Sequence, residues 1–302
     1  MLPKFVCEFT TNHMGNLHLA LRMAEKAAWA GCDYVKMQKK DVETFYTEAK
    51  LDSRFTSPYG KTYRDYRTIF EFSKEDFDRF DRKCKELGIP WFATAQDVPS
   101  LEFLLKYYDL DLYKVASTNS RNLPFLRFVA ENVPKDKTIV ISVGGSTLDE
   151  IEESLSIVSD HRMCLLHCVS EYPCPPEKLR LGNIEVLQKE FGDARVSIGF
   201  SGHEEGIVGT LAAVDLGATL VERHFTLSRH SFVHHIECSL EPEEYKRLIE
   251  IARSGSDLNG LYSDLPSEAF ESSFGMSVVE EDFLVRNKYG RMYLREGSQF
   301  EQ

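Results

Sequence analysis

Polar side chains stand at the ends of eight short apolar runs, and their types suit the binding of a phosphorylated anion. Lys36 and Lys114 lie near the ends of two of these runs. Hydroxyl groups lie near four run ends, at Thr94, Ser117, Ser142 and Ser201. Two ammonium groups with several hydroxyl donors suit a phosphate dianion. The alternative is that the lysines are paired or solvated, but regular polar ends on every run favour one shared site.

Histidines near the ends of the last two runs have the spacing of a metal site. His203 and His224 follow neighbouring runs, so a parallel barrel would bring their rings within several ångströms of each other. Two imidazoles with open positions can hold a divalent metal ion that polarises a carbonyl group. Buried or surface histidines without a ligand role are the alternative. The pair does not select one metal, because imidazole suits several first-row ions.

The apolar runs alternate with amphipathic segments, as repeated strand–helix units require. The predicted strands are Lys4–Phe9, Tyr34–Met37, Trp91–Ala93, Leu112–Ala116, Thr138–Ser142, Met163–Cys168, Val196–Phe200 and Thr219–Glu222. The predicted helices are Leu17–Ala30, Lys74–Leu87, Ser100–Tyr107, Leu123–Glu131, Leu148–Ser159, Leu181–Glu190, Glu205–Leu216 and Pro242–Arg253. This alternation predicts a closed parallel (β/α)8 barrel, with a doubly wound open sheet as the alternative. In such a barrel, active sites form where the strands end.

Two segments do not fit the alternation. Residues 40–72 form an insertion that is rich in aromatic and basic residues, and a long segment of this kind is usually functional when it is not disordered. Its aromatic content argues against disorder. Residues 254–302 have too little apolar content for a core of their own. We therefore expect residues 1–253 to form the barrel and residues 254–302 to form a C-terminal extension.

Composition limits the classes of partner and compartment. The 302 residues carry a net charge of −12, which argues against nucleic acid as the main partner because a phosphate backbone favours clustered Lys and Arg. No apolar run approaches the length of a membrane span, and a charged residue comes too early for a signal peptide. Seven scattered cysteines without a CxxC pair predict reduced thiols and a cytoplasmic protein.

Short motifs stand in order along the predicted barrel. They are Glu8–Asn16, Val35–Lys39, Tyr113–Ser117, His167–Pro173, Ile198–His203, Glu222–Thr226 and Ser239–Pro242. In this order and spacing they resemble the sialic acid (N-acetylneuraminate) synthase family. Gly60–Tyr63 in the insertion is similar to the vertebrate-type members. The resemblance extends over roughly residues 1–253 and agrees with the barrel that the alternation predicts.

The resemblance implies an enzyme that condenses phosphoenolpyruvate with N-acetylmannosamine or a related aldose, and with water, to give a nonulosonic acid and phosphate. It implies a divalent metal ion, Mn²⁺ or Mg²⁺, on His203 and His224. It implies that phosphoenolpyruvate contacts Lys36, Thr94, Lys114, Ser117, Ser142 and Ser201. Gln38 and Tyr172 would face the sugar, and Glu8 matches a catalytic position. The family also implies a homodimer.

The sequence departs from the family pattern in the sugar half of the site and in the tail. Asn119 stands where an acidic residue is common, and His235 lies in a segment that usually reads Gly-x-Asp. We expect both to contact the sugar. A different aldose or an aldose phosphate is therefore an alternative acceptor, and a catalytically silent sugar-binding paralogue is a third hypothesis. Residues 254–302 are expected to be a truncated remnant of the family's C-terminal antifreeze-like domain.

Overall fold

Eight parallel strands close into a barrel in which β1 is hydrogen-bonded to both β2 and β10. The computed structural model describes residues 2–231 and 233–284. The barrel strands are β1 Lys4–Glu8, β2 Tyr34–Lys39, β5 Trp91–Ala95, β6 Leu112–Val115, β7 Thr138–Ser142, β8 Arg162–His167, β9 Val196–Gly202 and β10 Leu220–His224. The closed barrel that the alternation predicts is confirmed, and the open sheet is excluded.

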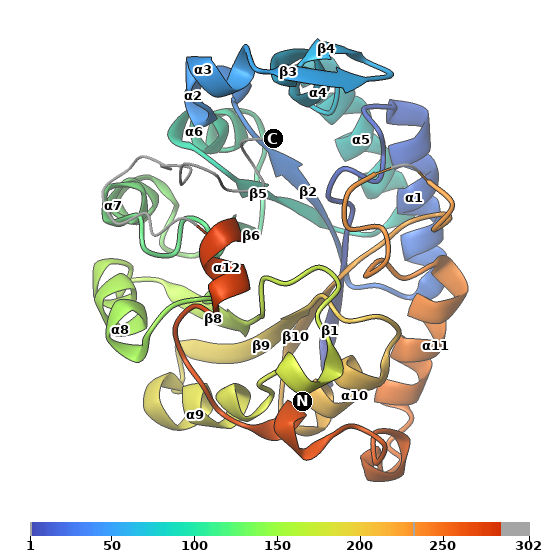
Figure 1. Ribbon diagram of the computed structural model, residues 1–302, viewed down its shortest axis with the longest axis vertical. Helices are drawn as coiled ribbons and strands as arrows, with labels where there is room; N and C mark the ends of the chain where they lie inside the picture. Colours follow the sequence, from blue (N-terminus) through green and yellow to red (C-terminus); the bar gives the residue numbers. More distant parts are fainter. Residues whose placement is uncertain (1, 232, 285–302) are drawn as a thin grey trace.

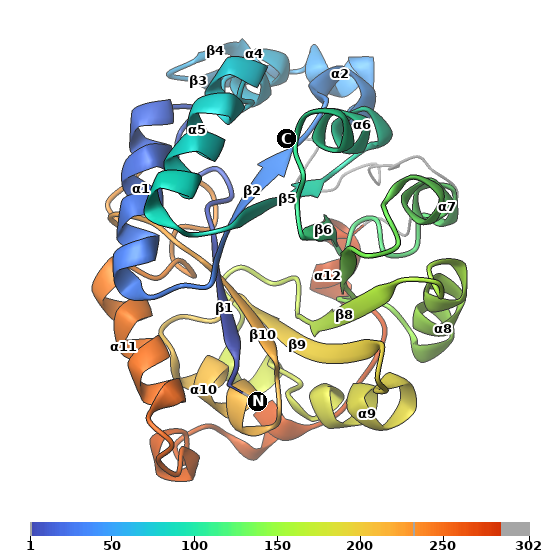
Figure 2. The same cartoon turned by 180° about the vertical axis from the view of Figure 1, so that it is seen from behind.

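Helices surround the barrel on its outside (Figures 1 and 2). They are α1 Leu17–Ala30, α5 Lys74–Leu87, α6 Val98–Tyr107, α7 Leu123–Asn132, α8 Leu148–Ile157, α9 Gly182–Phe191, α10 Val208–Asp215 and α11 Pro242–Arg253. Local sequence sets their ends. The Ser73 side chain caps α5 by accepting from the Asp76 amide, and Gly88 ends the helix in the left-handed conformation with φ of 66°.

Strand register places the polar residues at one level of the barrel. Glu8 on β1 is paired with Lys36 on β2 and with His224 on β10. Further round the barrel, Thr94 on β5 is paired with Gln38 on β2 and with Lys114 on β6. Because side chains alternate between the two faces of a strand, residues two apart on β2 point to the same side. The register therefore carries the polar side chains to the same end of the barrel.

The insertion of residues 40–72 is an ordered cap of short elements. They are α2 Val42–Phe45, α3 Glu48–Leu51, β3 Arg54–Ser57, β4 Gly60–Thr62 and α4 Tyr63–Thr68. The buried Tyr66 ring packs against Phe55 and Phe70, with centroid distances of 4.6 and 5.1 Å. Figure 1 shows these elements together at the top of the view, beyond the end of β2 and above α5 and α6. The aromatic residues thus form a local core that holds the insertion at the barrel mouth.

The C-terminal extension returns along the barrel to its mouth. After α11 it forms the short turns η2 Asn259–Leu261 and η3 Ser267–Phe270, and then α12 Val278–Phe283. A further turn, η1 Pro176–Lys178, lies between β8 and α9. The segment that leads into α12 contacts the loop between β7 and α8, where the Gly275 amide donates to the Ser146 carbonyl at 2.9 Å. The part of the predicted extension from 285 to 302 lies outside the described residues. Among the described helices, none is long and apolar enough to cross a membrane.

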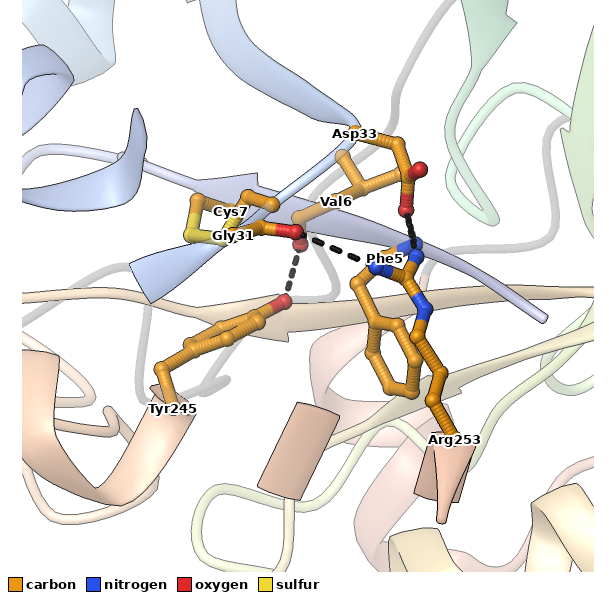
Figure 3. Close-up of a disulfide and its surroundings, with 8 residues drawn as sticks. Phe5, Val6, Cys7, Gly31, Asp33, Tyr245 and Arg253 are labelled. Atoms are coloured by element: carbon orange, nitrogen blue, oxygen red, sulfur yellow. Dashed lines mark hydrogen bonds and ion pairs between the residues drawn. A yellow bond between two sulfur atoms is a disulfide. The ribbon is translucent and has the colours of Figure 1, made fainter. Parts of the chain in front are cut away.

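Cys7 on β1 and Cys32, just after α1, are joined by a disulfide, with their Cα atoms 6.5 Å apart (Figure 3). The prediction of seven reduced thiols is therefore wrong for this pair. The sequence did not reveal the pair because the two cysteines approach each other only through the path that the chain takes from α1 back to β2. The other five cysteines are free and buried. Nearby, the Tyr245 hydroxyl donates to the Val6 carbonyl at 2.5 Å, and Arg253 pairs with Asp33. These contacts fasten α11 to the first strand.

Candidate active site

A cavity of about 550 Å³ opens at the C-terminal ends of the barrel strands. Its volume is within the range of small-molecule sites, roughly 300–1,000 Å³. The predicted site residues that line it are Glu8, Lys36, Gln38, Thr94, Lys114, Ser117, Ser142, Tyr172, Ser201, His203, His224 and His235. Residues far apart in the sequence therefore meet in one cavity, as the regular polar ends of the strands indicated.

Asn119 was predicted to contact the sugar, but it is not among the described residues that line the cavity. It is buried in the turn after β6, where its amide donates to the Gln96 carbonyl at 2.8 Å. Its side-chain oxygen accepts from Asn122 at 3.1 Å. The Asn119 side chain therefore supports its own turn and ties that turn to the end of β5, and the first of these is a common use of asparagine outside helices and strands.

Glu222 on β10 holds the two buried lysines side by side. Lys36 Nζ and Lys114 Nζ lie 2.9 and 3.4 Å from the same oxygen, Glu222 Oε1. Lys36 also donates to Thr94 at 3.1 Å, and Lys114 donates to Ser142 at 2.6 Å. The hydroxyl groups and the shared carboxylate offset the repulsion between two buried ammonium groups.

Burial and charge pairing set the protonation of this cluster. Burial lowers the pKa of Lys36 to about 8, although Glu222 acts in the opposite direction. Burial also favours the neutral form of Glu222, but attraction to Lys114 and Lys36 overrides it and lowers the pKa of that carboxyl. Glu8 forms an ion pair with Lys36 and accepts from Gln38 at 2.9 Å. Near neutral pH the cluster therefore holds ammonium and carboxylate groups together.

His203 presents one ring nitrogen to the cavity in its unprotonated form. Its Nδ1 lies 2.6 Å from the Val169 carbonyl oxygen, which can only accept, so Nδ1 carries the proton. Burial lowers the pKa of His203 to about 3, so the ring is neutral near pH 7. Its Nε2 therefore keeps a lone pair. A hydrogen bond that fixes the tautomer in this way is usual for a metal-binding histidine.

His224 has a matching arrangement through Cys238. The Cys238 thiol donates to the His235 carbonyl at 3.2 Å, and its sulfur lies 3.5 Å from His224 Nδ1. Burial raises the pKa of Cys238 to about 12, so the thiol keeps its proton. The sulfur then accepts from Nδ1–H of His224, which leaves Nε2 unprotonated. Burial and the neighbouring imidazoles also hold the pKa of His224 well below its ordinary value.

The donor set fits a metal ion held by two imidazoles. The His203 and His224 ring centroids are 5.3 Å apart, and both rings are neutral. In residues 2–231 and 233–284, no group of three or more His, Cys, Asp and Glu side chains is arranged to hold a metal ion. Two protein nitrogens would leave the remaining coordination positions open to substrate oxygens and water, as a catalytic site requires.

Tyr172 separates this pair from His235. The Tyr172 ring lies 4.2 Å from the rings of both His203 and His235, and its burial raises its pKa. His235 has a left-handed backbone with φ of 61°, and burial lowers its pKa to about 4. His235 therefore presents a neutral imidazole to the cavity, in the segment where the family pattern usually has an aspartate.

Two groups of lining residues were not among the predicted site residues. Glu222 lies two positions before His224 and so faces the same side of β10, while Arg223 between them faces outward and pairs with Glu204. The strand alternation was the signal that could have identified Glu222. The second group comes from the insertion. Its aromatic and basic composition is evident in the sequence, but no residue of it was assigned to the site. Its lining members are Lys40, Phe45, Tyr46, Lys50, Phe55, Tyr63, Tyr66 and Arg67.

The chain is similar in sequence to one protein family over most of its length. Residues 23–261 match the model of the NeuB family. An N-acetylneuraminate-9-phosphate synthase of Drosophila melanogaster is 38% identical over 249 residues, which is 80% of this chain and 65% of that protein. The human protein of the same name is 35% identical over 91% of this chain and 77% of its own length.

Solved structures agree with the fold. A sialic acid synthetase from Leptospira borgpetersenii, crystallised with citrate, has a TM-score of 0.72 and 26% identity, covering 94% of this chain and 90% of its own. The spore coat polysaccharide biosynthesis protein SpsE of Bacillus subtilis has a TM-score of 0.77 and 26% identity, covering 92% of this chain and 76% of its own. The extent of the family match, with these relatives, establishes that the chain belongs to the NeuB family.

Proposed function

We propose that this chain condenses phosphoenolpyruvate with N-acetylmannosamine or a related aldose, and with water, to give a nonulosonic acid and phosphate. The observation that carries the proposal is the placement of Lys36 and Lys114 in one cavity with the neutral imidazoles of His203 and His224. The names of the relatives support it, since they include N-acetylneuraminate-9-phosphate synthases and an N,N'-diacetyllegionaminic acid synthase of Campylobacter jejuni.

The reaction forms one carbon–carbon bond and breaks one carbon–oxygen bond. C3 of phosphoenolpyruvate bonds to the aldehyde carbon, water adds at C2, and phosphate leaves with the bridging oxygen. The aldehyde oxygen and the phosphate take up the two protons that the water releases. Lys36 and Lys114 would hold the phosphate and stabilise its charge as it leaves. Mn²⁺ or Mg²⁺ on Nε2 of His203 and His224 would polarise the aldehyde.

Phosphate release from phosphoenolpyruvate, measured with Mn²⁺ and a panel of aldoses, tests this function. We expect release that depends on the aldose, with N-acetylmannosamine or a close relative among the active sugars. Sugar binding without phosphate release, for every member of the panel, would contradict both enzyme hypotheses and favour the silent sugar-binding paralogue. Release with a single unrelated aldose would retain the chemistry and change the acceptor.

The protonation of Lys36 predicts how activity depends on pH. Its pKa is lowered to about 8, so the ammonium form is present below pH 8 and is lost above it. We expect kcat/KM for phosphoenolpyruvate to fall as the pH rises through about 8, because the neutral amine no longer attracts the phosphate. In Lys36→Arg this decline should move to higher pH, whereas a decline that persists unchanged in that variant would assign it to another group.

A specific feature of the cavity favours an aldose phosphate as the acceptor. Lys40 and Lys50 of the cavity wall are 8% and 7% exposed, and Arg67 lies beside them. Burial, followed by repulsion from Arg67, lowers the pKa of Lys40 well below its ordinary value. Arg67 Nε is buried without a hydrogen-bond partner in the described part of the chain. Such a cluster is stabilised by a bound anion.

The nearest carboxylates are engaged elsewhere. Glu71 accepts from Lys39 at 3.4 Å and from the Lys40 amide at 3.0 Å. Asp97 accepts from the amides of Asp41 and Ser100, both at 2.8 Å. The described cavity lining as a whole carries five cationic side chains and three carboxylates. A second anionic group on the substrate would therefore meet a complementary charge.

The position of that group follows from the chemistry. Condensation adds three carbons at C1 of the aldose, so a 9-phosphate on the product is a 6-phosphate on the sugar. The Drosophila and human relatives are named as synthases of such a 9-phosphate. We therefore propose that Lys40, Lys50 and Arg67 select an aldose 6-phosphate over the free aldose.

Arg67→Gln is expected to lower kcat/KM for the aldose 6-phosphate by about 10- to 100-fold, because one charge-assisted contact is lost. The value for the free aldose should change less than about threefold. Parallel progress curves with both sugars measure the ratio. Equal losses for the two sugars would contradict a phosphate-selecting role, and Arg79→Gln on α5 is the matched control at a distance from the cavity.

We propose two further statements about the working protein. The chain acts as a homodimer, as the family resemblance implies. It acts in the cytoplasm, where the five free cysteines would stay reduced. Sedimentation equilibrium over a range of protein concentrations tests the first statement, and a monomer at micromolar concentration would contradict it. Fractionation of source cells tests the second.

A further inference from the structure

The C-terminal segment, residues 274–284, forms part of the cavity wall. Val279 and Leu284 line the cavity, and Leu284 is 1% exposed. A Cβ atom on Gly145 would lie 2.8 Å from Leu284 Cδ1 and 2.9 Å from Met276 Cγ, so the loop after β7 packs closely against the segment. The Gly275 amide donates to the Ser146 carbonyl at 2.9 Å. The segment is therefore packed on the loop that follows β7.

Glu280 in this segment is a fully buried carboxylate with a long-range contact. It has 0% exposure, and its Oε1 accepts from the Ser170 amide at 3.1 Å. Its Oε2 lies 3.3 Å from Arg180 Nη1 and accepts from the Ser277 amide at 3.0 Å. Arg180 therefore supplies a positively charged partner for this buried side chain. A buried charge with this set of partners is expected to fix its neighbours firmly.

The Ser170 amide belongs to the same peptide group as the Val169 carbonyl. That carbonyl oxygen accepts from Nδ1–H of His203 at 2.6 Å. One peptide unit therefore receives a hydrogen bond from His203 at its oxygen and donates one to Glu280 through its nitrogen. Because a peptide group is planar, fixing its N–H also fixes the direction of its C=O. Hydrogen bonds in such a chain also polarise one another.

We propose that Glu280 is a positioning residue that acts through the Val169–Ser170 peptide to hold His203 in its Nδ1–H tautomer. The carboxylate orients and polarises the peptide, and the carbonyl then keeps the proton on Nδ1. Nε2 of His203 thereby stays unprotonated and directed for binding. The loop after β8, which contains Val169 and Ser170, also binds the backbone of His203. The Cys174 amide in that loop donates to the His203 carbonyl at 2.8 Å.

The metal-binding consequence rests on the proposed function, but the tautomer itself does not. Removal of a partner that orients a metal-binding histidine typically weakens metal affinity by about 10- to 100-fold. We therefore expect Glu280→Ala to weaken Mn²⁺ binding by about tenfold or more. Glu280→Gln should lie between wild type and Glu280→Ala, because its amide oxygen can still accept from Ser170 while its charge is lost.

The test combines two measurements on the full chain. The first is ¹⁵N NMR of ring-labelled histidine in the metal-free protein, with the His203 signal identified by its loss in His203→Gln. We expect the Nδ1–H form in wild type and a mixture with the Nε2–H form in Glu280→Ala. The second is direct Mn²⁺ titration followed by electron paramagnetic resonance. Glu268→Ala, an exposed change in the same extension, is the matched control.

The outcomes separate the two claims. An unchanged His203 tautomer in a folded Glu280→Ala variant would overturn the positioning role, whatever the metal result. A wild-type protein that binds no Mn²⁺ would contradict the proposed metal site. A changed His203 tautomer in Glu280→Ala would, in that case, still support the positioning role of Glu280. If Glu280→Ala does not fold, the same comparison in Glu280→Gln decides, with an intermediate mixture expected and an unchanged tautomer counting against the role.

Discussion

Lys114→Met is expected to lower kcat/KM for phosphoenolpyruvate by about 100- to 1,000-fold, which is the usual effect of removing one group that stabilises developing charge. Lys114 Nζ lies in the cavity between Ser142 and Glu222, at 2.6 and 3.3 Å. Methionine keeps much of the side-chain length and removes the charge. Steady-state phosphate release at varied phosphoenolpyruvate measures the effect, with Lys106→Met on the outer helix α6 as the matched control.

A loss of folding must be separated from a loss of chemistry. Lys114→Met leaves Glu222 with fewer partners, although Lys36 and Ser201 remain at 2.9 and 3.1 Å. An uncompensated buried charge is strongly destabilising. The double variant Lys114→Met/Glu222→Gln restores the charge balance, so its free energy of unfolding should recover while its activity stays low. Near-wild-type turnover in a folded Lys114→Met protein would show that Lys114 does not hold the phosphate.

His203→Ala is expected to abolish metal-stimulated turnover, with a loss of at least about 100-fold. One of two imidazoles would be missing from the proposed metal site, and the polarisation of the aldehyde would be lost with it. The pKa of His203 is about 3, so wild-type activity should show no decline that reports this ring between pH 5 and 8. Turnover with and without added Mn²⁺, and Mn²⁺ affinity, measure the effect.

His18 on the exposed face of α1 supplies the matched substitution, and His18→Ala should behave as wild type. His203→Ala also removes the hydrogen bond to Val169, so its thermal midpoint should fall by a few degrees without loss of the fold. Undiminished metal-dependent activity in this variant would refute the assignment of His203 as a ligand.

The barrel and the residues at its strand ends were predictable because both follow from local patterns. Strand alternation and helix caps depend on residues near in sequence, such as Ser73 before α5 and Gly88 after it. Once the strands are known, the parallel barrel determines which ends meet, and this places Lys36 beside Thr94 and Lys114 beside Ser142. The strand register then brings these side chains to the same level of the barrel.

The features that the sequence did not reveal are of two kinds. Some depend on contacts between segments that are far apart in the chain, and others on which hydrogen bonds a side chain makes within the fold. Glu280 reaches Ser170 across 110 residues, and no periodic pattern reports such a contact. Cys7 and Cys32 meet only because α1 returns its chain to the barrel. Asn119 has a residue type suited to sugar binding, yet its amide donates to the Gln96 carbonyl and its side-chain oxygen accepts from Asn122 in its own turn. In each case the contact is decided by how the chain packs in three dimensions, which no local sequence pattern reports.

Formation of a carbon–carbon bond between phosphoenolpyruvate and an aldose is the central claim. The most direct test is incubation of the protein with [3-¹³C]phosphoenolpyruvate, Mn²⁺, and N-acetylmannosamine or its 6-phosphate, followed by ¹³C NMR and mass spectrometry. We predict that the label appears as a ring methylene of a nine-carbon α-keto acid, formed in equal amount to the phosphate released. Recovery of the label only as pyruvate, or only as unreacted phosphoenolpyruvate with each aldose of the panel, would contradict the proposed reaction.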